Sequence, residues 1–434
     1  MVMIVTALGR LNLGIAARFM QDDFKFSTET MGWILGAFAF GYAIFQIPCG
    51  WAGDRYGPRV TLTVALVGWG LCTVLIAVVT SIRWTSPLAL AWSLAAIRLF
   101  TGAGEAASYP NANKVVAWWT TSRERGLGSS FLLGGVGTGG ILAPILFAAA
   151  ISRWGWRSSF IVTGALAISI ALVWFLFSTN YPHEHPKVNA AELATLTTSR
   201  SSGGGKHLFS LQGTPWRKIF SSGSVWALLL SYFCHGYTPF IYFTWFFVYL
   251  TKVRGLTITK GAFWGTTPFV AMTVMALLGG WLSDKAVTRF GRRRGRQSTV
   301  VFGMTCSALL LAAGSHAVGP ISAILLLAGA AGFGSFAAPS WWASCIDMTP
   351  HYSGSLSGVM NTCANMAGGL APVITAYIAT RFGWSQALDF AAMVNFITGV
   401  LWIFVNADVN LEVGSPTMTN DSVVLLSGDG RNLP

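Results

Sequence analysis

The sequence predicts an all-α integral membrane protein with twelve transmembrane helices, arranged as two similar six-helix halves. Three observations support this fold class. Hydrophobic residues make up 53% of the 434 residues and charged residues only 10%, with a mean hydropathy of +0.58. Apolar runs of about twenty residues, the length of a helix that crosses a bilayer, recur along the chain. Several short motifs of the first half recur in the second.

The composition also excludes several classes of protein. A soluble chain has about 25% charged residues, so this chain could not cover a water-facing surface. A cytosolic enzyme, a secreted disulfide scaffold and a disordered protein are therefore excluded. The six cysteines lie far apart, with no CxxC pair and no Cys/His cluster, so we expect neither a metal site nor disulfides.

The apolar runs are predicted to be helices, because they are too long for barrel strands and lipid admits only helices or closed barrels. In order, the predicted spans are 1–20, 30–53, 58–80, 87–110, 126–150, 157–178, 223–250, 262–283, 298–316, 319–345, 354–379 and 384–406. The polar segment 179–222 is expected to be a loop between two halves, 1–178 and 223–406. The polar tail 407–434 is expected to be disordered.

The two halves repeat each other at a nearly constant spacing. GWAGDR at 50–55 returns 230 residues later as GWLSDK at 280–285. LAP at 142–144 and RWGW at 153–156 return 228 residues later as LAP and RFGW. Because six is an even number, both halves enter the membrane in the same sense. Parallel repeats of this kind are typical of carriers that rock two halves about a midplane site.

The formal charge of +13 is explained by membrane topology. Most of the 28 Lys and Arg residues lie on the side of the central segment, so we expect that segment and both termini to be cytoplasmic. The basic run GRRRGR at 291–296 is interpreted as a loop on this side, and no nucleic-acid partner is expected. The chain starts directly in apolar sequence, so a short leader before Met1 is expected.

Three charged residues inside predicted spans are functional candidates, because each costs on the order of 3 kcal/mol in the hydrocarbon. Arg10 lies near the middle of the first span and Arg98 in the fourth. Glu105 follows Arg98 by seven residues on the same helix face, about 10 Å along the axis. Two arginines against one carboxylate leave an excess of positive charge, which an anionic ligand would balance. The planar guanidinium suits this role, since it binds a carboxylate in two places.

Each of these charges has an alternative interpretation. Arg10 is expected to contact the substrate, although it could instead tie helices together through backbone carbonyls. Arg98 is either a second substrate contact or part of a structural or gating ion pair. Glu105 is the expected proton carrier: when ionised it competes with substrate for the arginines, and protonation frees them. The alternative is a permanent salt bridge. Asp389 and His235 are interpreted as structural residues.

Two longer motifs resemble a known family. GYAIFQIPCGWAGDRYGPR at 41–59 resembles the helix 2 and loop 2–3 signature of the major facilitator superfamily. RLFTGAGEAASYPNANKVVAWWTTSRERG at 98–126, with GRLNLGIAARF in the first span, resembles the anion:cation symporter family. That family includes bacterial galactonate, glucarate and hexuronate carriers, and in animals sialin and the vesicular glutamate transporters. The resemblance covers essentially all twelve helices.

The resemblance implies proton-coupled symport of a small organic anion, such as a sugar acid, by alternating access. It also implies a monomer in a bacterial inner membrane, driven by the proton gradient without a cofactor. One departure concerns coupling: many bacterial members have an Asp immediately before the Arg of helix 1, where this chain has Gly9. An uncoupled facilitator or exchanger is therefore one alternative, and an efflux carrier is another. No P-loop, HExxH or GxSxG motif supports an ATPase or a hydrolase.

The family pattern also indicates further site residues. Polar and aromatic side chains at cavity positions are expected to contact the substrate: Tyr42, Tyr237, Tyr242, Ser340, Trp341 and Asn361. Core packing remains the alternative for each aromatic residue. The signature loops are expected to hold the outward-open state through ionic contacts and close helix approach: Gly50, Asp54, Arg55, Arg59, Asp284 and Lys285.

Overall fold

The computed structural model describes residues 1–120, 125–201, 216–349, 353–409 and 411, which fold into helices without a strand. The first half contains α1 (Val2–Phe24), α2 (Thr28–Val79), α3 (Pro87–Glu105), α4 (Ser108–Trp119), α5 (Arg125–Trp154) and α6 (Trp156–Phe177). The second contains α9 (Gly223–Thr244), α10 (Phe246–Val248), the π-helix η2 (Tyr249–Val253), α11 (Ile258–Gly265), α12 (Thr267–His316), α13 (Pro320–Met348), α14 (Ser353–Arg381) and α15 (Trp384–Trp402).

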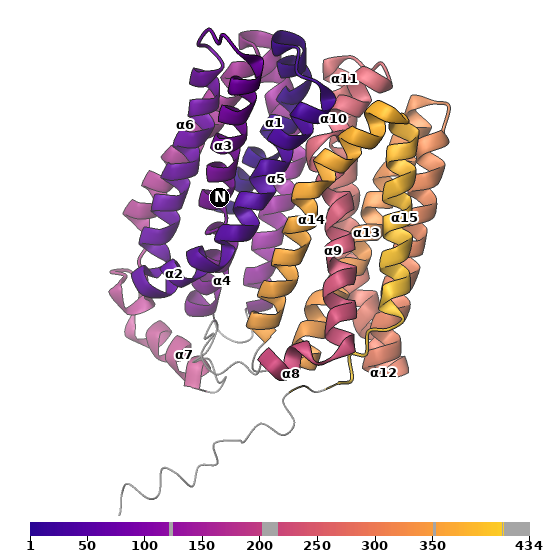
Figure 1. Ribbon diagram of the computed structural model, residues 1–434. Helices are drawn as coiled ribbons and strands as arrows, with labels where there is room; N and C mark the ends of the chain where they lie inside the picture. The colour runs from indigo at the N-terminus through magenta and orange to yellow at the C-terminus, as the bar shows by residue number, and fades with distance from the viewer. Residues whose placement is uncertain (121–124, 202–215, 350–352, 410, 412–434) are drawn as a thin grey trace, which may run out of the picture.

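The central segment is not a plain loop. It contains the short helices η1 (Pro182–Glu184), α7 (Ala190–Ser201) and α8 (Trp216–Phe220). Figure 1 shows the two halves standing side by side, with α7 and α8 at one end of the bundle and α10 and α11 at the other. We call these ends the loop side and the far side. Residues 410 and 412–434 lie outside the described residues, and the predicted disorder of the tail falls there.

Two long helices each contain two membrane crossings joined at one glycine. The backbone of Gly57 in α2 has φ 80° and ψ 157°, and that of Gly291 in α12 has φ 80° and ψ 166°. A positive φ is readily adopted by glycine and strained for other residues. Loops were expected at 54–57 and 284–297, and this expectation is wrong. The helix continues up to Gly57, or Gly291, and starts again directly after it.

With these corners counted, the described chain has the twelve helices predicted for the fold. Nine helices of the described residues are long and apolar enough to cross a membrane, and one of them, Ile258–His316, includes both crossings of α12. The remaining two are α9 and α15. Both contain polar side chains, among them His235 and Thr238 in α9 and Asp389 and Asn395 in α15. The predicted fold class is confirmed.

The fourth membrane helix is interrupted directly after Glu105. Residues Ala106 and Ala107 separate α3 from α4, and α4 continues to Trp119, beyond the predicted end at residue 110. Pro110 provides the physical reason, because the proline ring clashes with the carbonyl group four residues earlier, that of Ala106. The break follows Glu105 directly and thereby fixes the loop-side end of α3.

The halves meet on the far side through small residues. A Cβ atom at Gly36 of α2 would lie 2.3 Å from the carbonyl oxygen of Gly369 in α14. One at Gly14 of α1 would lie 2.4 Å from the carbonyl oxygen of Phe243 in α9. Only glycine permits backbones this close. The largest cluster of buried hydrophobic residues includes side chains of both halves.

One polar contact also joins the halves on the far side. Lys252 Nζ donates to Asp22 Oδ1 at 2.7 Å and to Gln21 Oε1 at 3.4 Å. Within the described residues these are the hydrogen bonds that run from one half to the other. The structure is thus closed on the far side.

Candidate transport site

The centre of the candidate site is an ion pair between α1 and the end of α3. Arg10 Nε donates to Glu105 Oε1, and the Arg10 guanidinium lies 4.8 Å from the centroid of the Tyr42 ring. The Glu105 side chain is fully buried, whereas that of Arg10 remains 19% exposed. Arg10, Tyr42 and Glu105 are therefore brought together, as the sequence predicted for a common site.

Close packing of α2 on α3 makes this arrangement possible. A Cβ atom at Gly102 would lie 2.0 Å from the carbonyl oxygen of Phe38, and one at Gly41 would lie 2.0 Å from that of Leu99. These glycines bring the two backbones into contact. Phe38 and Tyr42 of α2 consequently lie against the charged face of α3.

Arg98 has no carboxylate partner within the described residues. It is 4% exposed, its guanidinium lies 4.6 Å from the Phe38 ring centroid, and its buried Nε has no hydrogen-bond partner. Glu105 bonds Arg10 instead, and Glu105 Oε2 is likewise buried without a partner. Buried polar atoms are normally satisfied. The unsatisfied Arg98 Nε and Glu105 Oε2 therefore indicate a place that binds something polar.

The position of Gly9 bears directly on Glu105. A Cβ atom at Gly9 would lie 3.7 Å from Glu105 Oε2 and 3.1 Å from Cζ3 of Trp69. The Asp found at this place in many members of the resembled family would thus lie beside Glu105. Among the described residues, Glu105 supplies the carboxylate that contacts Arg10.

Sequence reasoning missed Tyr109, which follows Glu105 by one helical turn. It lies in the first turn of α4, near Arg10 and Tyr42. Tyr232 of α9, in the other half, also lies near Tyr109. Tyr109 falls at the end of the predicted span 87–110, and no role was predicted for it. Tyr109 follows Glu105 by four residues, and this helical spacing is the sequence signal that could have identified it.

The residues expected in the second half lie elsewhere and make packing contacts. The Tyr237 hydroxyl pairs with the hydroxyl of Thr375 at 2.8 Å, and the Tyr242 hydroxyl donates to the Leu327 carbonyl oxygen at 2.7 Å. Ser340 Oγ lies 3.1 Å from Ser283 Oγ and is fully buried. The structure does not bring these three side chains to the Arg10–Glu105 pair.

Trp341 is also fully buried. Its Nε1 donates to Ser231 Oγ at 2.9 Å, and its ring is stacked on that of His235, with centroids 4.8 Å apart. One face of the Trp341 ring is therefore covered by His235, which lies in the packing position predicted for it, and the expected contact of Trp341 with the substrate stays a prediction. Asn361 is half-buried in α14, where its backbone carbonyl oxygen accepts a hydrogen bond from Asn365 Nδ2 at 2.8 Å.

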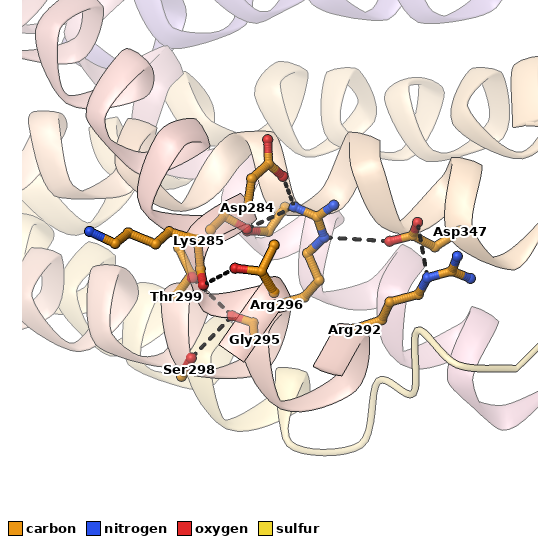
Figure 2. Close-up of polar contacts among 11 residues, drawn as sticks. Asp284, Lys285, Arg292, Gly295, Arg296, Ser298, Thr299 and Asp347 are labelled. Carbon is orange, nitrogen blue, oxygen red and sulfur yellow. Dashed lines mark hydrogen bonds and ion pairs between the residues drawn. The ribbon is translucent and has the colours of Figure 1, made fainter. Parts of the chain in front are cut away.

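The signature residues of the second half form a closed network on the loop side. Arg296 Nη1 donates to Asp284 Oδ1 and to Ser283 Oγ, both at 2.9 Å, and Arg296 Nε lies 3.4 Å from Asp347 Oδ2. Figure 2 shows these contacts, with Arg292 also directed at Asp347 and Lys285 pointing away. In this structure, which is closed on the far side, Arg296 of the same helix holds Asp284. The expectation that the signature loops hold the outward-open state concerns the opposite arrangement of the halves and stays a prediction.

The first half shows the same behaviour. The Arg59 guanidinium donates to the carbonyl oxygen of Phe175 at the end of α6, and Arg55 lies 5.4 Å from the Trp51 ring centroid. The expected close approach at Gly50 is wrong, since a Cβ there would meet only Pro110, at 3.9 Å. The crowded residue is Gly53, whose Cβ would lie 1.7 Å from Asn111 Oδ1. The side chain of Asp54 lies outside the described residues.

Comparison with known proteins agrees with this geometry. The model of the Major Facilitator Superfamily matches residues 1–372 and 289–425. A probable sulfoacetate transporter of Cupriavidus necator is 30% identical over 433 residues, covering 99% of this chain and 95% of that protein. A D-galactonate transporter of Escherichia coli is 29% identical, covering 94% and 93%.

Among solved structures, a bacterial homologue of the human lysosomal transporter Spinster, in an inward-facing and occupied conformation, superposes with a TM-score of 0.75. The two share 17% identity over 96% of this chain and 97% of that one, which supports the fold. The matching family and the curated relatives are transporters, so this multi-pass chain is a membrane transporter and not an enzyme. The chain belongs to the Major Facilitator Superfamily.

Proposed function

We propose that this protein is a secondary transporter that moves a small organic anion, with sugar acids as the first candidates, together with protons. The observation that supports this most directly is the unequal charge at the site. Arg10 and Arg98 face a single carboxylate, that of Glu105, and Arg98 has no carboxylate partner within the described residues. A carboxylate ligand would supply the missing negative charge in a geometry that the guanidinium binds well.

The proton step follows from the same pair. While Glu105 is ionised it holds Arg10, and only Arg98 is available to an anion. A proton that binds Glu105 neutralises the carboxylate and releases Arg10, so both arginines can hold the ligand. When the site opens to the other side, anion and proton leave together, and the Arg10–Glu105 pair forms again. The relatives named as a probable sulfoacetate transporter and as a D-galactonate transporter support a carboxylate-containing substrate.

Alternating access is the proposed mode of movement. The far-side contacts between Gly36 and Gly369 and between Lys252 and Asp22 close one face, while the Asp284–Arg296 network keeps its contacts inside one half. We further propose that the loop side is cytoplasmic, that the membrane is a bacterial inner membrane, and that a monomer works without a cofactor. An uncoupled facilitator or exchanger is the second candidate, favoured by Gly9. Efflux of the anion, instead of uptake, is a further alternative.

The test uses purified protein in liposomes that hold a pH-sensitive dye. Galactonate, glucarate, glucuronate, gluconate, glutamate and sulfoacetate are added outside, one at a time. Internal acidification with one of them would support symport and give the substrate class. Exchange of radiolabelled ligand without acidification would favour the uncoupled alternative. Absence of both with every compound would contradict the proposal.

A further inference from the structure

A large open groove lies away from the transport site, on the outer surface of the first half. Its volume is about 740 Å³, and its walls come from the two crossings of α2 and from α3. Phe45, Tyr56, Val64 and Phe100 line it and are between 36% and 66% exposed. In a membrane protein, side chains that are apolar and exposed in this way face lipid.

The length of the groove matches one leaflet of a bilayer. On the first crossing of α2 the lining runs from Phe45 to Tyr56, and on the second from Val60 to Cys72. At 1.5 Å per residue these segments span roughly 16 to 18 Å. Half of the hydrocarbon core of a bilayer is about 15 Å. The groove therefore begins at the loop-side surface and ends near the midplane, as an acyl chain of that leaflet does.

The guanidinium of Arg55 lies at the loop-side mouth of the groove. The Arg55 guanidinium lies 5.6 Å from the ring centroid of Tyr56, which lines the groove, and 5.4 Å from that of Trp51. Within the described residues Arg55 forms no ion pair, whereas the guanidinium of Arg59 is engaged by the Phe175 carbonyl oxygen. Trp, Tyr and Arg gather at the level of lipid headgroups.

We propose that this groove is a binding site for an anionic phospholipid of the loop-side leaflet, with one acyl chain in the groove and the phosphate on Arg55. Charge complementarity favours this occupant. A zwitterionic lipid would offer the same phosphate but would bring its own ammonium group beside Arg55, whereas an anionic lipid carries a net negative charge that the guanidinium attracts. The inner wall includes Ala103, Gly104 and Ala107, which flank Glu105 in the chain. The bound chain would thus pack against the back of the helix that holds the ion pair.

The test measures lipid binding directly and does not depend on transport. The full-length protein is placed in phosphatidylcholine nanodiscs with a minor fraction of phosphatidylglycerol bearing a photoreactive acyl chain. After illumination, labelled peptides are identified by mass spectrometry. We expect labelling of residues between Phe45 and Cys72, and at least about fivefold less labelling there with a phosphatidylcholine analogue of the same chain.

Two variants remove the two parts of the site. Arg55→Gln should lower the labelling by phosphatidylglycerol to the level of phosphatidylcholine, whereas Arg55→Lys should retain most of it. Gly68→Leu should lower labelling by both lipids, because Gly68 lines the groove and a Cβ there meets nothing within 4 Å. Lys285→Gln is the matched control, since Lys285 is the repeat counterpart of Arg55 and lies 5.0 Å from the Trp281 ring centroid.

Two outcomes would overturn the proposal. Equal labelling by the two lipids would mean that the groove holds bulk lipid only, and would overturn the proposal. So would phosphatidylglycerol labelling that survives Arg55→Gln. Unchanged elution of each variant on gel filtration shows that the fold is retained, so that a lost label reports the site.

Discussion

At the scale of single residues, Glu105 determines the coupling proposal, because one of its oxygens meets Arg10 and the other is buried without a partner. A permanent salt bridge and a proton carrier predict different behaviour when this carboxylate is removed. The difference appears in what drives uptake and not in whether the substrate binds.

Glu105→Gln keeps the size of the side chain but cannot exchange a proton. We expect uptake driven by a pH gradient to fall at least about tenfold, with exchange of labelled substrate retained. Both are measured in liposomes with the same preparation. Glu192→Gln, in α7 and remote from the pair, is the control and should match the natural protein. Persistence of pH-driven uptake in Glu105→Gln would rule out the proton role.

Substitution of Arg98 tests whether this arginine binds the anionic substrate or is a buried charge without a role in binding. Because lysine keeps the charge but loses the planar fork, Arg98→Lys should raise the KM for substrate exchange about tenfold or more. Arg98→Gln should abolish exchange. A KM in Arg98→Lys equal to that of the natural protein would place the ligand elsewhere.

Gly9 allows the number of coupled protons to be changed by design. Gly9→Asp would place a second carboxylate beside Glu105, after a small shift of Trp69. We expect the ratio of protons to substrate, obtained from reversal potentials, to increase. Gly9→Asn has the same size without a proton site and should leave the ratio unchanged. An equal increase in both variants would contradict this interpretation.

At the scale of elements, the sequence predicted the number and order of the membrane helices, because about twenty apolar residues leave few other structures in lipid. It missed α7, which follows no apolar pattern and has little hydrophobic surface to reveal it. It also missed that helix continues up to Gly57 and Gly291, since polarity alone does not separate a loop from a tight helical corner.

The candidate site was predicted unevenly for a related reason. Arg10, Arg98 and Glu105 stand out because charge in an apolar span is costly. Tyr237, Tyr242 and Trp341 were selected by position in a family pattern, and a hydroxyl or indole that packs against its own half has the same sequence signal. Their partners, such as Thr375 and Ser231, lie more than a hundred residues away along the chain.

Close contact between α2 and α14 makes Gly36 a test of far-side closure. Gly36→Ala puts a methyl group 2.3 Å from the Gly369 carbonyl oxygen, so we expect the far side to remain open and transport to fall at least about tenfold. Gly134→Ala in α5 adds the same methyl group where nothing lies within 4 Å and should transport normally. Normal transport by Gly36→Ala would show that these helices separate more easily than the structure indicates.

At the scale of the whole molecule, the halves are joined on the far side by many apolar contacts and one polar one. The Lys252–Asp22 pair is largely exposed, with side chains 32% and 57% accessible. Exposed ion pairs contribute less than about 1 kcal/mol. The pair can therefore adjust the balance between the two open states but cannot determine it.

Lys252→Asp places two carboxylates opposite each other, and we expect the fraction of molecules closed on the far side to decrease about fivefold or less. Spin-label distances across the far side measure this fraction. The exchanged pair Lys252→Asp with Asp22→Lys should restore it. A double variant that behaves like the single one would show that attraction between these two residues is not the cause.

The glycine corners at Gly57 and Gly291 have a mechanical consequence. With a single residue between the two crossings of α2, and again of α12, neither hairpin contains slack that could absorb a displacement. When one crossing tilts, the crossing joined to it by that single residue is expected to tilt with it. In the proposed rocking mechanism, the displacement is therefore expected at the contacts between the halves, such as that of Gly36 with Gly369, and not inside these two hairpins.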